Sequence, residues 1–175
     1  MASYRDYLEF ASKYLNLAKE ENTTRNGADW LLIPATVLAW SAIEAFINNM
    51  FDDFTKLPDD MFELHERAFL QETRVRFVDT GEKHGFFELD GAEYRRLEDK
   101  IAFLIAKFSS NERIEKGNGL WQDFARFKQT RDNLVHPRRS RDTLLTISEV
   151  AQHIDTAKSI IQYVSKHVWK YSVEL

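Results

Sequence analysis

The segment Thr130–Asp142 gathers the side chains of this sequence that are best suited to chemistry on a phosphate. It holds four arginines, one histidine and one proline in thirteen residues. An arginine guanidinium can bind a phosphate through two parallel hydrogen bonds, and a histidine can transfer protons near neutral pH. Arg131 and His136, five positions apart, are therefore a candidate pair for acid–base chemistry at a phosphodiester.

Cleavage of RNA without a metal sets three demands on such a pair. The attacking 2′-hydroxyl must lose a proton, the departing 5′-oxygen must gain one, and the phosphorane between them carries extra negative charge. His136 would transfer the protons and Arg131 would stabilise the charge. Asn133, between them, would hydrogen-bond the phosphate or orient the histidine. These three are the predicted catalytic residues, and this chemistry implies no cofactor and no metal.

The charge around this pair differs from that of the whole chain. Residues 126–141 carry six basic side chains and one acidic side chain, a local charge of +5, whereas the formal net charge of the protein is −4. A phosphate-binding patch on a chain with no overall basic field has this distribution. The alternative is an ordinary solvated turn. The predicted RNA-binding residues are Arg126, Lys128, Arg138, Arg139 and Arg141.

The local structure around Arg131 follows from its position on an apolar stripe. An arginine on such a stripe costs free energy unless its charge is paired or reaches water. His136 precedes a proline, which disfavours the α conformation, so the helix is expected to end at or before His136. This break would let His136 turn back beside Arg131. The stripe consists of Leu120, Phe124, Phe127, Arg131 and Leu134.

Apolar residues recur at spacings of three and four along most of the chain, which predicts an all-α protein, a helical bundle of about five to six helices. The expected helices cover about 3–21, 29–54 with Pro34 in its first two turns, from near 58 toward 78, 92–108, 120–134, and a long last helix. Residues 80–91 and 109–119 are expected loops. On the first helix, Tyr7, Phe10, Tyr14 and Leu17 share a face.

The last helix has the clearest pattern in the sequence. Thr146 and Glu149 are spaced as a capping box, in which each side chain bonds the backbone of the other residue. A seam with strict 3-4 spacing follows, which is typical of a helix that packs in a bundle or against a partner. The seam consists of Ile147, Val150, Ile154, Ala157, Ile161, Val164 and Val168.

Composition sets the broad class. The 175 residues suggest one domain, 1–175, with an N-terminal helix and turn (1–27) and a core bundle (28–175). The absence of cysteine excludes disulfides and thiolate chemistry, and it fits the cytoplasm. The longest uncharged run, residues 30–43, is shorter than the roughly 20 residues of a membrane span, so a buried core helix and no membrane association are expected.

The run from Arg131 to Pro137 resembles the Arg-x4–6-His signature of the HEPN superfamily. Here, as in that family, the motif closes one helix and a long final helix follows it. Upstream, residues 41–48 (SAIEAFIN) are similar to the family's early core helix, which often carries a glutamate.

The resemblance implies an all-α homodimer in which two Arg–His pairs meet at the interface, and many such proteins are metal-independent ribonucleases. It maps the catalytic pair to Arg131 and His136 and the polar position of the motif to Asn133, or to Asp132. In the commonest form an Asn directly follows the Arg, whereas Asp132 stands there in this chain. The implied partners are RNA, a second copy and, for a toxin or phage-defence ribonuclease, an antitoxin protein.

Two questions stay open at the level of sequence. Glu44 and Asn48 belong to a polar stripe on the second expected helix, and with Asp132 they are second-tier site candidates. The alternative is that the stripe is simply the solvent-exposed side of the helix. The alternative to a ribonuclease is a non-catalytic HEPN-like binding or scaffold module. A salt bridge from Arg131 within the fold, with His136 facing away, would favour that module.

Overall fold

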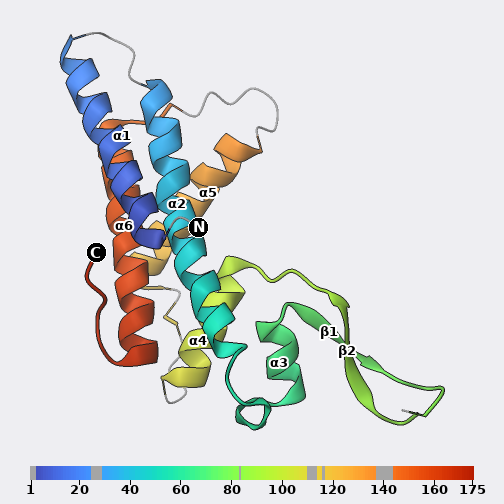
Figure 1. The fold of residues 1–175 in the computed structure, drawn as a ribbon. Helices are drawn as coiled ribbons and strands as arrows, with labels where there is room; N and C mark the ends of the chain where they lie inside the picture. The colour runs from blue at the N-terminus through green and yellow to red at the C-terminus, as the bar shows by residue number, and fades with distance from the viewer. Residues whose placement is uncertain (1–2, 25–28, 83, 110–113, 116, 137–143) are drawn as a thin grey trace. The chain divides into compact units, whose positions relative to one another are not determined.

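The computed structural model describes the chain except for residues 1–2, 25–28, 83, 110–113, 116 and 137–143 (Figure 1). Within the described residues, six α-helices, one short 3-10 helix (Asp59–Met61) and one two-stranded sheet make up the regular structure, so the predicted all-α bundle of five to six helices is confirmed. The helices are α1 (Tyr4–Thr24), α2 (Asp29–Phe54), α3 (Leu64–Leu70), α4 (Leu97–Phe108), α5 (Gly119–Val135) and α6 (Ile147–Trp169).

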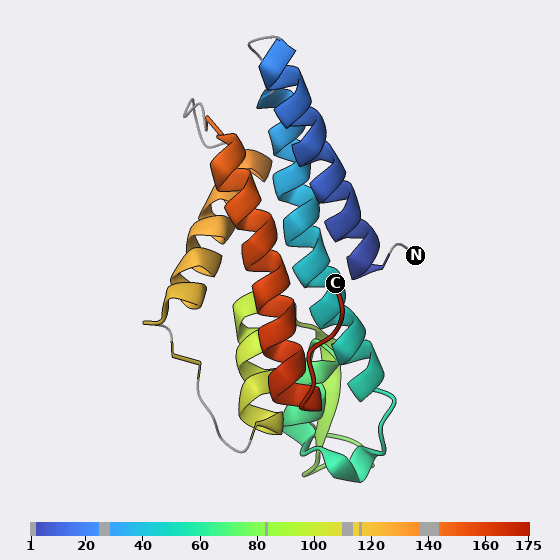
Figure 2. The same ribbon diagram turned by 90° about the vertical axis from the view of Figure 1, so that its left-hand side faces the viewer.

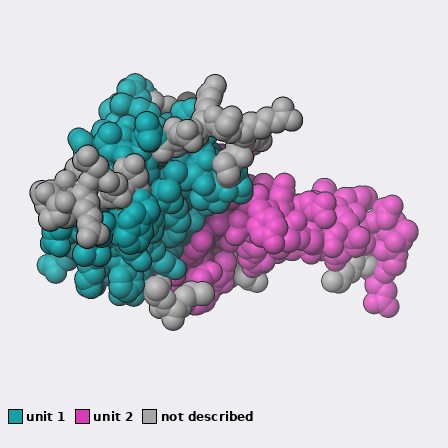
Figure 3. Space-filling view, turned by 90° about the horizontal axis from the view of Figure 1, so that it is seen from above, with its two compact units in different colours: residues 1–46, 102–175 teal, residues 47–101 magenta. Residues whose placement is uncertain are grey.

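The chain divides into two compact units (Figure 3). Unit 1 comprises residues 1–46 and 102–175, and unit 2 comprises residues 47–101. Helices α2 and α4 each run from one unit into the other. The single domain that the sequence suggests stays a prediction, because a division by contacts does not show whether the two units fold independently.

In unit 1, α6 packs against α1 and α5 (Figure 2). The seam of α6 is largely confirmed, because Val150, Ile154, Ala157, Ile161 and Val164 are buried. On α1 the buried positions are shifted by one residue from the face shared by Tyr7, Phe10, Tyr14 and Leu17. That helix buries Leu8, Ala11, Leu15 and Ala18, and leaves Phe10 and Leu17 about half exposed.

The ends of α5 and α6 follow from their capping residues. At α6, the hydroxyl of Thr146 accepts a hydrogen bond from the Glu149 backbone N–H and the Glu149 carboxylate accepts one from the Thr146 N–H, which confirms the predicted capping box. The side chain of Asn118 accepts from Trp121 N–H at the start of α5. Helix α5 ends at Val135, as the proline after His136 predicts.

Unit 2 contains the main difference from the sequence prediction. The expected helix from near residue 58 toward residue 78 is wrong, since α3 ends at Leu70 and β1 (Thr73–Phe77) follows. Part of the expected loop 80–91 is also wrong, because β2 (Phe87–Ala92) pairs antiparallel with β1. Glu72 lies at a φ of 50°, a left-handed conformation that a helix cannot continue through. Beyond it, the residues from Arg74 to Phe77 (RVRF) alternate polar and apolar with the period of a strand.

Helix α2 is the most apolar element of the protein. Its stretch Trp30–Phe54 is long and apolar enough to cross a membrane. The 18-residue window tested in this stretch has a mean hydropathy of 1.7, but 56% of it is buried inside the fold. This burial is what the prediction of a core helix requires. Pro34 lies inside α2, in its second turn, where the missing N–H costs the helix one backbone hydrogen bond.

Candidate active site around Arg131

The guanidinium of Arg131 is held within unit 1 by two carboxylates. Its Nη1 donates to Oδ1 of Asp132 at 3.0 Å, and its Nη2 lies 3.5 Å from Oε1 of Glu44. The guanidinium carbon lies 5.8 Å from the ring centroid of Trp40, in cation–π contact. With 24% of the side chain exposed, Arg131 is a largely fixed cation whose Nε has no hydrogen-bond partner among the described residues.

The partners of Arg131 are fixed in turn by the core of unit 1. Trp40 and Glu44 lie one turn apart on α2, and the Trp40 Nε1–H donates to Glu44 Oε1 at 2.7 Å. The buried indole stacks on Phe124 of α5 at 5.2 Å and meets the ring of Phe127 edge-on at 5.3 Å. The aromatic residues of the predicted α5 stripe therefore hold in place the indole that Arg131 contacts.

His136 occupies the C-cap of α5. Its φ and ψ of −124° and 67° lie outside the helical region, and its backbone N–H donates to the carbonyl of Asp132 at 2.9 Å. The side chain is exposed. Asp132 thus bonds Arg131 through its carboxylate and His136 through its backbone, which ties the two candidate residues to one position. The imidazole itself is accessible to a substrate.

His153 is a second histidine that the structure brings close to this cluster, through Phe127. It is buried on α6, where its ring stacks on Phe127 with centroids 4.5 Å apart and planes 9° apart. Burial lowers the pKa of His153 from 6.5, and the nearby Glu149 carboxylate opposes this shift. The sequence signal was its place three residues after Val150, on the buried side of the seam.

The other predicted residues are dispersed. Asn133 is exposed in the last turn of α5, and the exposed Arg126 pairs with Asp123 at 2.7 Å. Asn48 belongs to unit 2, where its Oδ1 accepts from Lys100 Nζ at 2.9 Å. Lys128 is half-buried. The predicted RNA-binding residues Arg138, Arg139 and Arg141 lie outside the described residues.

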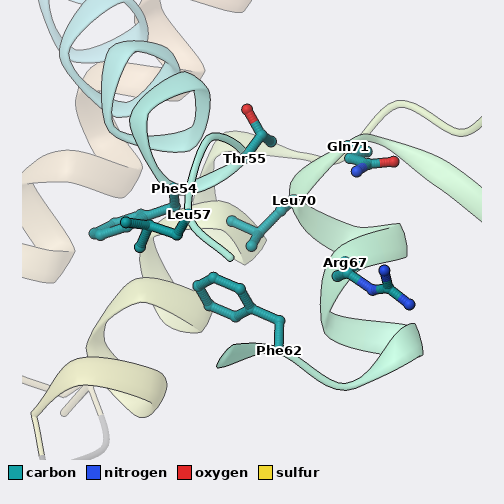
Figure 4. Close-up of a pocket in the computed structure, with 7 residues that line it drawn as sticks. All are labelled: Phe54, Thr55, Leu57, Phe62, Arg67, Leu70 and Gln71. Carbon is teal, nitrogen blue, oxygen red and sulfur yellow. The ribbon is translucent and has the colours of Figure 1, made fainter. Parts of the chain in front are cut away.

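Two hollows of the surface lie away from these side chains. One, in unit 2, is surrounded by apolar side chains that point toward one another, those of Phe54, Leu57, Phe62 and Leu70 (Figure 4). The other, in unit 1, is bordered by Arg5, Glu9 and Lys158. In the part of the chain that the structure describes, no group of three or more His, Asp or Glu side chains is placed to hold a metal ion.

The arrangement joins a fixed cation to an exposed imidazole at the end of one helix. An anion can bind Arg131 if it displaces the two carboxylates or binds the guanidinium together with them. A group that reaches His136 can exchange protons with its imidazole. No family model, curated protein or solved structure matches the chain.

Proposed function

We propose that this protein is a metal-independent endoribonuclease of the HEPN type, with His136 as the acid–base residue and Arg131 as the phosphate-binding residue. The observation that carries the proposal is the contrast between the two side chains. Arg131 is held by Glu44, Asp132 and the Trp40 ring, whereas His136 is exposed at the C-cap of the same helix. Phosphodiester cleavage needs a positioned cation and an accessible imidazole, and both groups lie near the C-terminal end of one helix.

The reaction proceeds by attack of the 2′-oxygen on phosphorus. His136 accepts the 2′-hydroxyl proton as the new O–P bond forms, and an imidazolium donates a proton to the 5′-oxygen as the P–O5′ bond breaks. The products are a 2′,3′-cyclic phosphate and a 5′-hydroxyl. Arg131 stabilises the charge of the phosphorane, and Asn133 assists from the same helix end. In a homodimer, the second His136 would supply the second proton-transfer group.

A non-catalytic binding module is the second candidate, and one observation favours it. Both outer nitrogens of Arg131 already face carboxylates, from Glu44 and Asp132. A phosphate would have to compete with two negative charges that lie within 3.5 Å of the guanidinium. In this case the basic segment from Arg126 onward would dock RNA or an acidic protein, such as an antitoxin, without cleaving it.

The test is cleavage of total and synthetic RNA by the purified protein in EDTA, with analysis of the product ends. The proposal predicts 2′,3′-cyclic phosphate ends, and loss of cleavage in Arg131→Ala and in His136→Ala. Cleavage at the wild-type rate in either variant would contradict the proposed catalytic roles of Arg131 and His136. RNA binding without cleavage by the folded wild type would favour the module.

Controls of matched chemistry guard against a co-purified nuclease. His84→Ala removes an exposed histidine from the segment between β1 and β2, and Arg96→Ala removes an exposed arginine before α4. Both variants should cleave like the wild type when purified in the same way. Far-UV circular dichroism should show that the two site variants and the two control variants keep the helix content of the wild type.

A further inference from the structure

The guanidinium of Arg131 leaves one edge on which an anion can form two parallel hydrogen bonds. A guanidinium offers such pairs of N–H groups either from its two outer nitrogens or from Nε and one outer nitrogen. The Nε of Arg131 is buried and has no hydrogen-bond partner among the described residues, so the edge that includes it is closed to a ligand. A phosphate that binds Arg131 through two hydrogen bonds therefore has to approach the edge formed by Nη1 and Nη2.

Two carboxylates already occupy this outer edge. Nη1 donates to Oδ1 of Asp132 at 3.0 Å, and Nη2 lies 3.5 Å from Oε1 of Glu44. One positive charge thus faces two negative charges, and the three side chains together carry a net negative charge. A phosphate that approaches Arg131 meets this negative charge before it reaches the guanidinium.

The two carboxylates differ in how firmly they are held. Oε1 of Glu44 also accepts a hydrogen bond from the buried Trp40 indole at 2.7 Å. Displacement of Glu44 would leave that buried donor without a partner, which is costly. The Asp132 side chain is 43% exposed, so water can solvate its carboxylate when it leaves Arg131. Glu44 is therefore the fixed partner of the guanidinium, and Asp132 is the displaceable one.

We propose that Asp132 is an internal competitor for the phosphate-binding edge of Arg131 and that its carboxylate leaves Nη1 when a phosphate binds. The inference rests on the proposed role of Arg131 as the phosphate-binding residue. Carboxylate and phosphate oxygens bind a guanidinium edge in the same geometry, so both cannot occupy Nη1 at once. Because Asp132 is the next residue of the chain, its carboxylate competes at a high effective concentration.

This competition selects the class of ligand that can open the site. A single free phosphate has only its own bonds to Arg131 to offset the displaced carboxylate. A nucleic-acid strand has further phosphates, which bind other basic side chains and hold the strand near Arg131. Asp132 therefore keeps the site closed to small anions and admits a polyanionic strand.

The first test is the affinity for a short single-stranded DNA, measured by fluorescence anisotropy at low ionic strength. DNA lacks the attacking 2′-hydroxyl, so binding is measured apart from cleavage. Asp132→Asn removes the charge but keeps a side-chain oxygen that can accept from Arg131, and it should tighten binding about two- to fivefold, the effect of one exposed ion pair. Asp155→Asn makes the same charge change at an exposed position of α6 and should leave the affinity close to that of the wild type.

The same measurement in an Arg131→Ala background separates local competition from a general effect of charge. Without the guanidinium, Asp132→Asn should no longer tighten binding. A gain that persists in this background, or a gain equal to that of Asp155→Asn, would overturn the competitor role. If Arg131→Ala weakens binding but Asp132→Asn does not tighten it, the phosphate-binding role of Arg131 stands and the competitor is refuted. If Arg131→Ala does not weaken binding, both fail.

A titration with inorganic phosphate gives a second readout at the site itself. The indole N–H of Trp40 donates to the same Glu44 oxygen that faces Arg131, so its NMR resonance reports on the guanidinium. Trp40→Phe identifies that resonance. The wild type should need about two- to fivefold more phosphate than Asp132→Asn for half of the shift. Identical titration curves, or no shift in either protein, would contradict the proposal.

Discussion

Glu44 joins the Trp40 indole to the Arg131 guanidinium, so two substitutions at this one residue separate its two interactions. Glu44→Gln keeps an oxygen that can accept from Trp40 Nε1 but removes the charge that faces Arg131. The two charged side chains are 24% and 38% exposed, and their closest atoms are 3.5 Å apart. Solvent screens such a pair, and its loss should cost about 0.5–1 kcal/mol of unfolding free energy.

Glu44→Ala also removes the acceptor of the Trp40 Nε1–H. Trp40 is 3% exposed, and a buried donor without a partner costs about 1–3 kcal/mol. The expected total for Glu44→Ala is therefore about 1.5–4 kcal/mol, well above that for Glu44→Gln.

Urea unfolding followed by circular dichroism at pH 7 measures both losses. Asp52→Asn, an exposed carboxylate further along the same helix, is the matched control and should change stability by less than about 0.5 kcal/mol. A double-mutant cycle of Trp40→Phe with Glu44→Ala, which removes the acceptor, should give a coupling of about 1 kcal/mol for the indole hydrogen bond. Equal costs for Glu44→Gln and Glu44→Ala, with no coupling in the cycle, would refute the linked arrangement of Trp40, Glu44 and Arg131.

Three further substitutions test the frame around the site. Phe127→Ala should cost about 3–5 kcal/mol in urea unfolding, because it leaves a cavity under Trp40 and His153. His153 should make the protein less stable in acid. Its folded-state pKa lies below 6.5, so the unfolded chain binds more protons than the folded one. Stability should therefore fall as the pH drops through 6.5 and level off below the folded-state pKa. In urea titrations from pH 7.5 to 5, His153→Phe should flatten this fall, and an unchanged pH slope would contradict the assignment. Thr146→Ala removes half of the α6 capping box and should cost about 1 kcal/mol, measured as a lower Tm.

The elements that the sequence predicted well are those whose stability is local and strongly periodic. The α6 seam and its capping box, and the end of α5 before a proline, each depend on spacings of a few residues. For Arg131 the sequence predicted only that the charge must be paired or reach water, because the residue lies on an apolar stripe. It did not identify the partner. Its partner Glu44 lies 87 positions earlier in the chain, and only the packing of α2 against α5 brings the two together.

The hairpin and the face of α1 show where local patterns fail. Segment 74–77 alternates with period two over only four residues, too few to outweigh the helical pattern before it. On α1, aromatic residues at Phe10 and Tyr14 suggested one face, whereas the fold buries the neighbouring face with Ala11 and Ala18. Small residues let α1 approach its neighbours closely, and that choice depends on tertiary contacts that a single helix does not specify.

The single-turnover rate of His136→Ala tests most directly whether His136 transfers protons in RNA cleavage. At saturating enzyme, in EDTA, with one short single-stranded RNA, the rate constant of this variant should be about 10²–10⁴-fold below that of the wild type. Binding of the same RNA should be little changed. A His136→Ala rate equal to that of an active wild type, or a folded wild type that binds RNA and never cleaves it, would contradict the account.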